Sequence, residues 1–229
     1  MMVQAADKWN DNYEALWRAA EAIYVYSDTL HKKYNVENYE NALSKNQIKV
    51  AGDVLKRSNY LDSAQSSELL KFGIMARKYA DKAVELKPEG PEGHYYDAMG
   101  IATYSYGKSI VKALLEGLAP KYERHLNEVI RSNKGYQNGI LFIAYGRYYY
   151  ELPWPKHSDK KSLEKLLLAE KYNPEDIRAL DFLGDTCYDM GRKDDAVKYW
   201  TRVMNSTFKA HQGEYIKKLA QEKLKYAGK

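Results

Sequence analysis

The chain has 229 residues, of which 45% are hydrophobic and 29% are charged, and its 36 basic and 31 acidic residues leave a net charge of +5. Because the two signs are interspersed along the chain, with no basic block, this balance argues against a nucleic-acid-binding surface. The single cysteine, Cys187, excludes an intrachain disulfide framework. No apolar run reaches the roughly 20 residues of a membrane-spanning helix, so we expect no such segment.

Helix-favouring residues dominate the chain, and many of its 6 prolines and 14 glycines mark possible helix ends. This composition predicts an all-α protein that forms one domain over residues 1–229. A first helix is expected over residues 7–33, where Trp17 and Tyr24 recur at helical spacing. Residues 34–62 match no repeat and are interpreted as an insertion.

A pattern typical of paired helices recurs along the rest of the chain. Near the C-terminal end, Gly184 precedes Ala196 and Trp200 at the spacing of the tetratricopeptide repeat, a helix pair of about 34 residues. The two small residues allow the helices to approach closely, and the tryptophan fills the space beside them. Earlier copies of the pattern are centred on Gly100 and Gly146.

Helix pairs of this kind bury their apolar faces against their neighbours, so they stack into an array. The sequence therefore predicts a tetratricopeptide-repeat helical solenoid, in which antiparallel helix pairs form a right-handed superhelix. We expect its repeat units over residues 63–205. Residues 206–229 are expected to form a C-terminal capping helix, because apolar residues recur at helical spacing between Glu214 and Tyr226.

A rigid turn interrupts one of these pairs at ELPWPKHSD, residues 151–159. Leu152 and Trp154 each precede a proline, which disfavours the helical conformation, so we expect a helix to end there. Ser158 and Asp159 are both candidate N-caps for the next helix. Trp154 has two interpretations: it covers the end of its own helix pair, which we favour, or it protrudes as an anchor for a partner.

First helices of stacked repeats line the concave face of a solenoid, which is where such proteins bind their ligands. Consecutive residues lie about 100° apart around a helix, so the residues that pack inside a pair fix which of their neighbours face the groove. We predict on this basis that Tyr149 packs inside its pair while Tyr150 and Arg147 face the groove. The alternative is that the groove positions are ordinary solvated residues. The full set of predicted groove residues is His94, Asp97, Tyr104, Arg147, Tyr150, Arg178, Asp181, Asp185 and Tyr188.

Motifs that would indicate catalysis are missing from the sequence. The five histidines and the single cysteine show no metal-binding spacing, and no glycine-rich phosphate-binding loop occurs. We therefore predict a non-enzymatic protein with no catalytic residues, no cofactor and no metal. An unfamiliar enzyme stays among the alternatives, because a groove rich in Tyr, Asp and His could carry chemistry that no short motif reveals.

Three segments carry a resemblance to a known family: GPEGHYYDAMGIATYSYG at residues 90–107, SIVKALLEGLAPKYERHLNEVI at residues 109–130, and GRYYYELPWPKHSDKKSLEKLLLAEKYNP at residues 146–174. They are similar to the tetratricopeptide-repeat component associated with TRAP transporters, the TatT-like proteins, over roughly residues 70–200. The resemblance implies a periplasmic helical scaffold, lipid-anchored in its full-length precursor. Such a scaffold works beside the solute-binding protein of a TRAP uptake system for small organic anions. The resemblance also implies that the chain can form a homo-oligomer.

Some features depart from this family and leave alternatives open. No cysteine near residue 1 could carry a lipid, so a cytoplasmic location stays open beside the periplasm. The groove positions also lack the set of basic and amide side chains with which some repeat adaptors clamp a peptide carboxylate, and Asp97, Asp181 and Asp185 would oppose one. The alternative function is therefore a general protein–protein interaction adaptor unrelated to transport.

Overall fold

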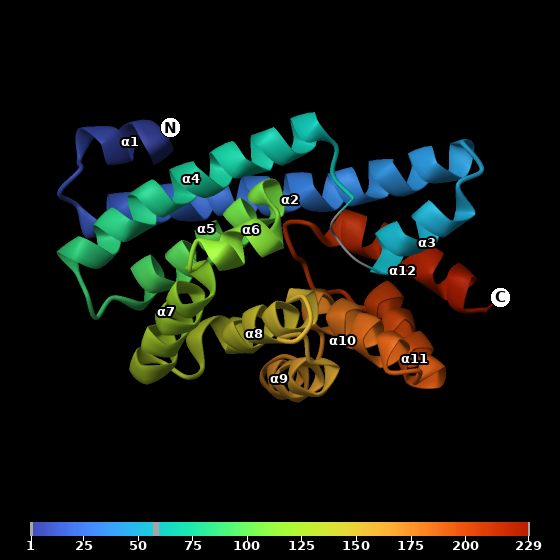
Figure 1. The fold of residues 1–229 in the computed structure, drawn as a ribbon. Helices are drawn as coiled ribbons and strands as arrows, with labels where there is room; N and C mark the ends of the chain where they lie inside the picture. The colour runs from blue at the N-terminus through green and yellow to red at the C-terminus, as the bar shows by residue number, and fades with distance from the viewer. Residues whose placement is uncertain (1, 57–59, 229) are drawn as a thin grey trace. The chain divides into compact units, whose positions relative to one another are not determined.

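The structure, a computed structural model, describes residues 2–56 and 60–228, and all of the regular structure in these ranges is helical (Figure 1). The all-α prediction is confirmed. The first helices are α1 (Met2–Lys8), α2 (Tyr13–Ser44), α3 (Ile48–Lys56), α4 (Ser63–Leu86), α5 (Pro91–Lys108), α6 (Ile110–Leu115) and α7 (Leu118–Ser132). The 3-10 turn η1 (Tyr136–Gly139) is followed by α8 (Ile140–Glu151), α9 (Asp159–Tyr172), α10 (Ile177–Asp189), α11 (Lys193–Asn205) and α12 (Gly213–Ala227).

The chain divides into two compact units. Unit 1 consists of Met1–His31 and Leu61–Lys134, and unit 2 consists of Lys32–Tyr60 and Gly135–Lys229. The boundary after His31 falls inside α2, so each unit takes one part of that helix. Each unit is described separately below.

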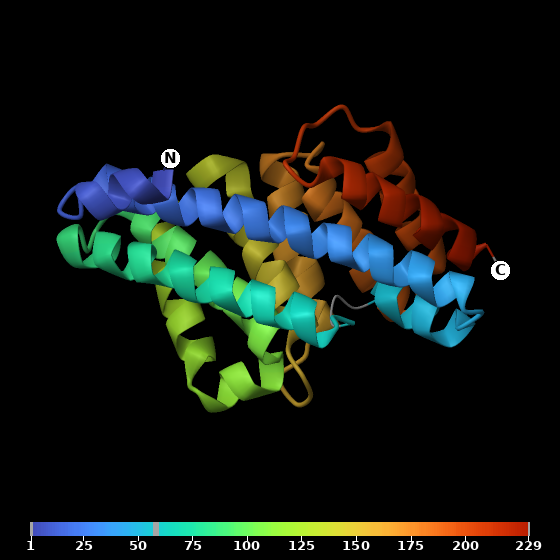
Figure 2. The same cartoon turned by 90° about the horizontal axis from the view of Figure 1, so that it is seen from above.

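Unit 1 is built on the antiparallel pair α4 and α5, against which α7 also packs (Figure 2). The two helices of the pair approach closely at glycines. A Cβ atom on Gly73 would lie 2.4 Å from the backbone nitrogen of Tyr104, and one on Gly107 would lie 2.2 Å from that of Leu70. Larger residues at these positions would force the helices apart.

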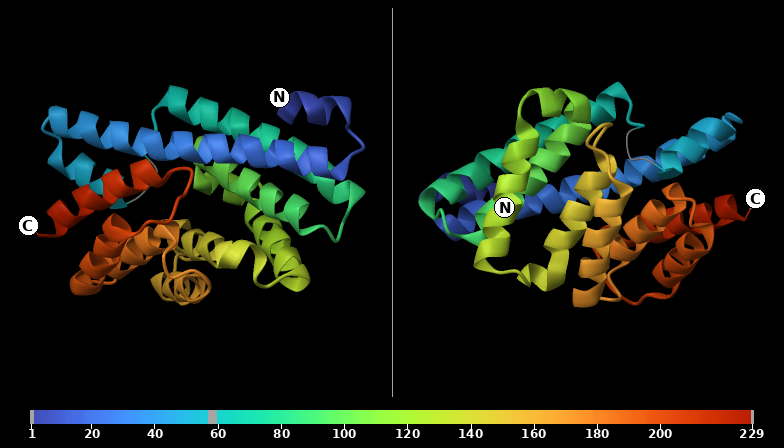
Figure 3. Two further views of the ribbon diagram at one scale, coloured as in Figure 1. Left: turned by 180° about the vertical axis from the view of Figure 1, so that it is seen from behind. Right: turned by 60° about the horizontal axis from the view of Figure 1, so that its bottom comes forward.

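Unit 2 contains two successive helix pairs, α8 with α9 and α10 with α11 (Figure 3). In the first pair, a Cβ atom on Gly146 would lie 2.4 Å from Cγ of Leu166. In the second pair, a Cβ atom on Gly184 would lie 2.2 Å from Nε1 of Trp200. The same contact between a small and a large residue therefore recurs in both pairs.

The C-terminal helix α12 packs on α11 and on α3 within unit 2. One apolar cluster joins it to α10 and α11 through Ile216 and Ala220. A second cluster joins Leu219 to Val36 and Val54, which lie in the later part of α2 and in α3. The helix predicted from the apolar spacing is thus present, and it has partners that the repeat pattern did not indicate.

Two expectations for the N-terminal region were wrong. The helix predicted over residues 7–33 is broken, because α1 ends at Lys8, and α2 then runs from Tyr13 to Ser44. The segment 34–62, interpreted as an insertion, contributes the end of α2 and the whole of α3, and both pack in unit 2. Residues 57–59 of that segment lie outside the described residues. By contrast, α4 begins at Ser63 and α11 ends at Asn205, at the predicted bounds of the repeats.

The proline-rich turn between α8 and α9 has the predicted helix ends. Helix α8 ends at Glu151 with Leu152 as its C-cap, and the hydroxyl of Ser158 accepts a hydrogen bond from the backbone of Lys161 at the start of α9. Trp154 is 88% exposed, so the favoured interpretation, in which it covers its own helix pair, was wrong. None of the described helices has both the length and the apolar character needed to cross a membrane.

Candidate functional site

Most of the predicted groove residues fall into two buried clusters, one in each unit. The buried members in unit 1 are His94 and Asp97, and those in unit 2 are Arg147, Tyr150, Asp181 and Asp185. They are therefore not an open groove surface, and charges without water around them need partners nearby.

An ion triad forms the centre of the unit 2 cluster. Nζ of Lys223, from α12, lies 2.6 Å from Oδ1 of Asp181 and 2.6 Å from Oδ1 of Asp185. The two aspartates stand one turn apart on α10, which places both carboxylates on the same helix face. One lysine therefore bridges two carboxylates and joins α12 to α10.

Arg147 extends this cluster to α8. It forms an ion pair with Glu151 one turn later, and its Nη1 lies 3.4 Å from Oδ2 of Asp185. Its guanidinium also stacks between the rings of Tyr150 and Phe182, at 4.7 and 4.5 Å from their centroids. Because a guanidinium loses less hydration than an ammonium on burial, arginine suits this aromatic setting.

Burial and charge shift the ionisation of this cluster. Burial and the neighbouring charge of Asp181 raise the pKa of Asp185 to about 6, although Lys223 and Arg147 oppose the change. Burial alone would lower the pKa of Lys223, but the charges of both aspartates outweigh it and raise that pKa. The lysine stays charged at neutral pH, whereas Asp185 takes up a proton on mild acidification.

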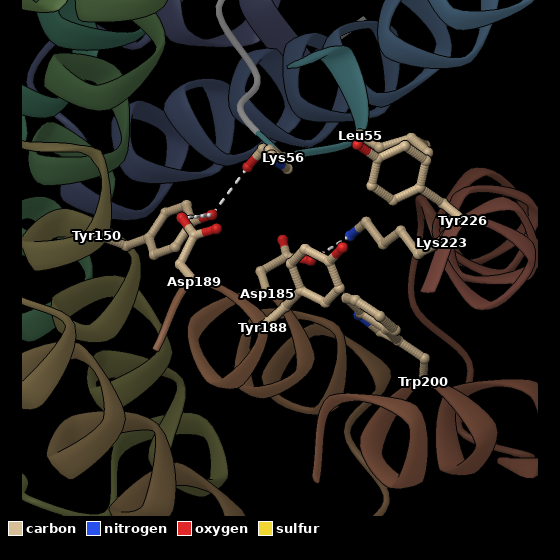
Figure 4. Close-up of a pocket in the computed structure, with 9 residues that line it drawn as sticks. All are labelled: Leu55, Lys56, Tyr150, Asp185, Tyr188, Asp189, Trp200, Lys223 and Tyr226. Carbon is tan, nitrogen blue, oxygen red and sulfur yellow. Dashed lines mark hydrogen bonds and ion pairs between the residues drawn. The ribbon is translucent and has the colours of Figure 1, made fainter. Parts of the chain in front are cut away.

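A small pocket opens beside the triad, and Figure 4 shows its walls. Its volume is about 10 Å³, close to the minimum needed to hold a single water molecule. The residues that line it are Leu55, Lys56, Tyr150, Asp185, Tyr188, Asp189, Trp200, Lys223 and Tyr226. A small organic molecule could enter only if one of these side chains moved.

The two tyrosines at the end of α8 have the reverse of their predicted burial. Tyr150 is 1% exposed, and its hydroxyl lies 2.9 Å from both Oδ2 of Asp189 and the carbonyl oxygen of Lys56. Tyr149 is only half-buried and stacks against Tyr145. The face assigned to an open groove is instead covered by α3 and α12, so the prediction that Tyr150 is a surface residue was wrong.

Three predicted groove residues are partly exposed, and one of them, Tyr104, borders the unit 1 cluster, with its ring centroid 5.6 Å from the guanidinium of Arg77. Arg178 turns back to Asp176, the N-cap of its own helix, with Nε 2.9 Å from Oδ1. Tyr104 donates a hydrogen bond of 2.7 Å to Glu116 in unit 1. Only Tyr188, in the pocket wall, joins the unit 2 site.

A chain of polar contacts forms the unit 1 cluster. Nε2 of His94 lies 2.7 Å from the carbonyl oxygen of Pro88, and its Nδ1 lies 2.9 Å from Nδ1 of His125. The other ring nitrogen of His125, Nε2, lies 2.8 Å from Oδ2 of Asp97. Arg77 approaches the second carboxylate oxygen of Asp97 at 3.6 Å.

Proton counting shows what this chain of contacts requires. Its two ends, the carbonyl of Pro88 and the carboxylate of Asp97, are acceptors, so three hydrogen bonds need three protons. Two neutral imidazoles supply only two. Neutral imidazoles therefore leave one of the three contacts without a hydrogen, and the nearest fixed positive charges are Arg77 beside Asp97 and Arg124 beside His125.

Burial is the largest cause of the lowered pKa of His94, and the charge of His125 adds to it. Asp81, on α4, has its pKa raised to about 6 by burial and by the charge of Asp97. The unit 1 cluster thus combines a histidine that resists protonation with a carboxylate that accepts a proton readily. Among the described residues, no group of three or more His, Cys, Asp or Glu side chains could hold a metal ion.

The sequence interpretation missed the residues that complete both clusters. Lys223 stands on the apolar stripe of α12, one turn after Leu219 and Ala220. His125 stands on the apolar stripe of α7, between Tyr122 and Val129. In both cases a titratable residue at a core position of an amphipathic helix was the available signal, because such a residue must meet a buried partner.

No family model matches the chain, and no curated protein matches it.

Proposed function

We propose that this protein is a non-enzymatic binding scaffold built from helix pairs of the tetratricopeptide type. The observation that carries the proposal is the recurring packing in unit 2, where Gly146 meets Leu166 and Gly184 meets Trp200 in successive pairs. The repeat pattern in the sequence has its small and large residues at these same positions. Repeats of this kind present extended surfaces for partners.

The chemistry of the two clusters supports binding over catalysis. In unit 2, Lys223 and Arg147 are already engaged by carboxylates of the same chain, and the adjoining pocket has a volume of only about 10 Å³. In unit 1, His125 is held between His94 and Asp97 in the interior. A general acid or base needs access to a substrate, which neither arrangement provides.

The resemblance of residues 90–107, 109–130 and 146–174 to the TRAP-associated repeat proteins extends this proposal to a particular partner. The scaffold would accompany the periplasmic solute-binding protein of a TRAP transporter during uptake of small organic anions. A homo-oligomer and a lipid-anchored precursor belong to the same proposal. It rests on the resemblance of these segments.

A general protein-interaction adaptor is the second candidate, and one surface feature favours it. Trp154 protrudes with 88% of its surface exposed, and the exposed lysines Lys156 and Lys160 lie close to it in the sequence. Exposed tryptophans are frequent anchors at protein–protein interfaces. Such an anchor would serve a partner with an acidic rim, whether or not that partner takes part in transport.

Binding of the full-length chain to the co-encoded solute-binding protein, measured by biolayer interferometry, tests the companion function. We expect Trp154→Ala to weaken the binding by about 30-fold, as expected for an anchor worth about 2 kcal/mol. Trp9→Ala is the matched control, since Trp9 is also exposed, at 52%, and should leave the affinity unchanged. Failure of the wild-type chain to bind would overturn the companion function.

A further inference from the structure

Two tyrosine rings form a wedge at the mouth of the unit 2 pocket. Tyr188 of α10 and Tyr226 of α12 have ring centroids 6.3 Å apart, and their planes are inclined by 55° (Figure 4). Trp200 of α11 lies behind them, with its ring centroid 5.6 Å from that of Tyr188. The face of an aromatic ring carries partial negative charge. Two inclined rings whose faces border the same space therefore attract a cation into that space.

The wedge already holds a cation from the same chain. Nζ of Lys56, the last residue of α3, lies 5.9 Å from the centroid of Tyr188 and 5.9 Å from that of Tyr226. This is the outer limit of a cation–π contact. Among the described residues, no carboxylate lies within ion-pair distance of this ammonium. Lys56 therefore occupies the wedge with weak contacts.

Among the residues that the structure describes, two ammonium groups and two carboxylates line the pocket, and only one of the carboxylates, Asp185, is engaged in an ion pair. Asp185 and Asp189 both contribute to its walls, but the ammonium of Lys223 is already shared between Asp181 and Asp185. Asp189 accepts a hydrogen bond from Tyr150 and has no ion-pair partner among the described residues. A free ammonium could approach the rings more closely than Lys56 does and could also reach this carboxylate.

We propose that the wedge is a binding site for an organic ammonium group, for which the side chain of Lys56 is an internal stand-in. The ligand class is an alkylammonium compound, and methylated ammonium groups suit it best because aromatic walls can replace their weak hydration. The existing cavity, about 10 Å³, is too small for such a group, so the ligand displaces Lys56. The site is separate from the proposed TRAP-linked function and does not require it.

Choline titrated into the full-length chain at constant ionic strength, followed by calorimetry, tests this site. Lys56→Ala should bind choline at least about tenfold more tightly than the wild-type chain. In the wild-type chain, choline can bind only to the fraction of molecules in which the side chain of Lys56 has left the wedge, and this lowers the apparent affinity. Lys49→Ala, which removes an exposed lysine from the same helix, should behave like the wild type.

Two further comparisons make the result specific. The neutral choline analogue 3,3-dimethyl-1-butanol should not bind to Lys56→Ala, because it has the same shape and no charge. Adding Tyr226→Leu to Lys56→Ala should abolish choline binding while helicity, measured by circular dichroism, is retained, since Tyr226 is only half-buried near the end of α12. Equal choline affinity in Lys56→Ala and the wild type, or equal binding of the neutral analogue, would overturn the proposal.

Discussion

The two units neutralise buried carboxylates in different ways. In unit 2, Asp181 and Asp185 are balanced by Lys223 and Arg147, which keep their charge across the physiological range. In unit 1, the carboxylate of Asp97 lies 2.8 Å from a ring nitrogen of His125, which in turn contacts His94, and 3.6 Å from the guanidinium of Arg77. The comparison shows that buried carboxylates can be satisfied by two fixed cations, as in unit 2, or by one guanidinium together with a pair of imidazoles, as in unit 1.

The largest expected effect concerns the fixed cation of unit 2. Lys223→Met should lower the free energy of unfolding by about 3–5 kcal/mol, because it leaves two carboxylates buried beside one another without their shared partner. Denaturant unfolding at pH 7 measures the loss. Lys225→Met is the control, since Lys225 is exposed and pairs with Glu222 on the surface, and it should cost less than about 0.5 kcal/mol. Equal effects of the two substitutions would show that the triad contributes no special stability.

An intermediate effect is expected for the carboxylate next to that cation. The pKa of Asp185 is raised from 3.8 to about 6, so the folded chain binds this proton more tightly than the unfolded chain does. Its contribution to stability is therefore complete below about pH 4 and is lost as the pH rises through about 6. Asp185→Asn imitates the protonated form and should increase the free energy of unfolding at pH 7 by about 1–3 kcal/mol.

That gain should disappear toward pH 4, where the wild-type carboxyl group is itself protonated. Unfolding curves of both chains at pH 4 and pH 7 provide the measurement. Asp189→Asn serves as the control, because Asp189 is exposed and should show little difference between the two conditions. A loss of stability in Asp185→Asn at pH 7 would mean that the cations outweigh the carboxylates in this cluster.

The smallest effect is expected in unit 1, where two shifts oppose each other. The lowered pKa of His94 makes the folded state less stable as the pH falls below 6.5, whereas the raised pKa of Asp81 makes it more stable as the pH falls through about 6. Amide hydrogen exchange in α5 and α7, corrected for intrinsic rates, should therefore change less than about threefold in protection between pH 7 and pH 5.

Removing one of the two opposing groups should reveal the other. In His94→Asn, only the shift of Asp81 remains, so protection of the α7 amides should increase on acidification. An equally flat response in this variant would contradict the assignment of opposing shifts.

Local sequence rules predicted the helix ends and the close contacts well. Helix α8 ends at Glu151 because the two prolines that follow disfavour the helical conformation, and of the two candidate caps, Ser158 and Asp159, it is Ser158 that caps α9. Gly146 and Gly184 stand where a side chain would collide with the second helix of each pair. These features depend on residues that are close in the chain, and for this reason they can be recognised from spacing alone.

The same rules did not predict which face of a helix is covered. Periodicity fixed the angle between Tyr149 and Tyr150, about 100° around the helix, but it could not show which of the two would be buried. That choice depends on α3, whose Lys56 carbonyl accepts a hydrogen bond from Tyr150 across 94 positions of sequence. Contacts over such separations leave no trace in the local hydrophobic pattern.

The sequence by itself determined that the protein is helical, where the helix before the two prolines ends, and where small residues allow close approach, because these properties follow from backbone sterics and local spacing. Only the tertiary structure decided that Lys223 meets Asp181 and Asp185, and that His125 links His94 to Asp97. A charged residue on an apolar stripe indicates that it has a buried partner. Which partner it has depends on helices that are distant in the chain and adjacent only after folding.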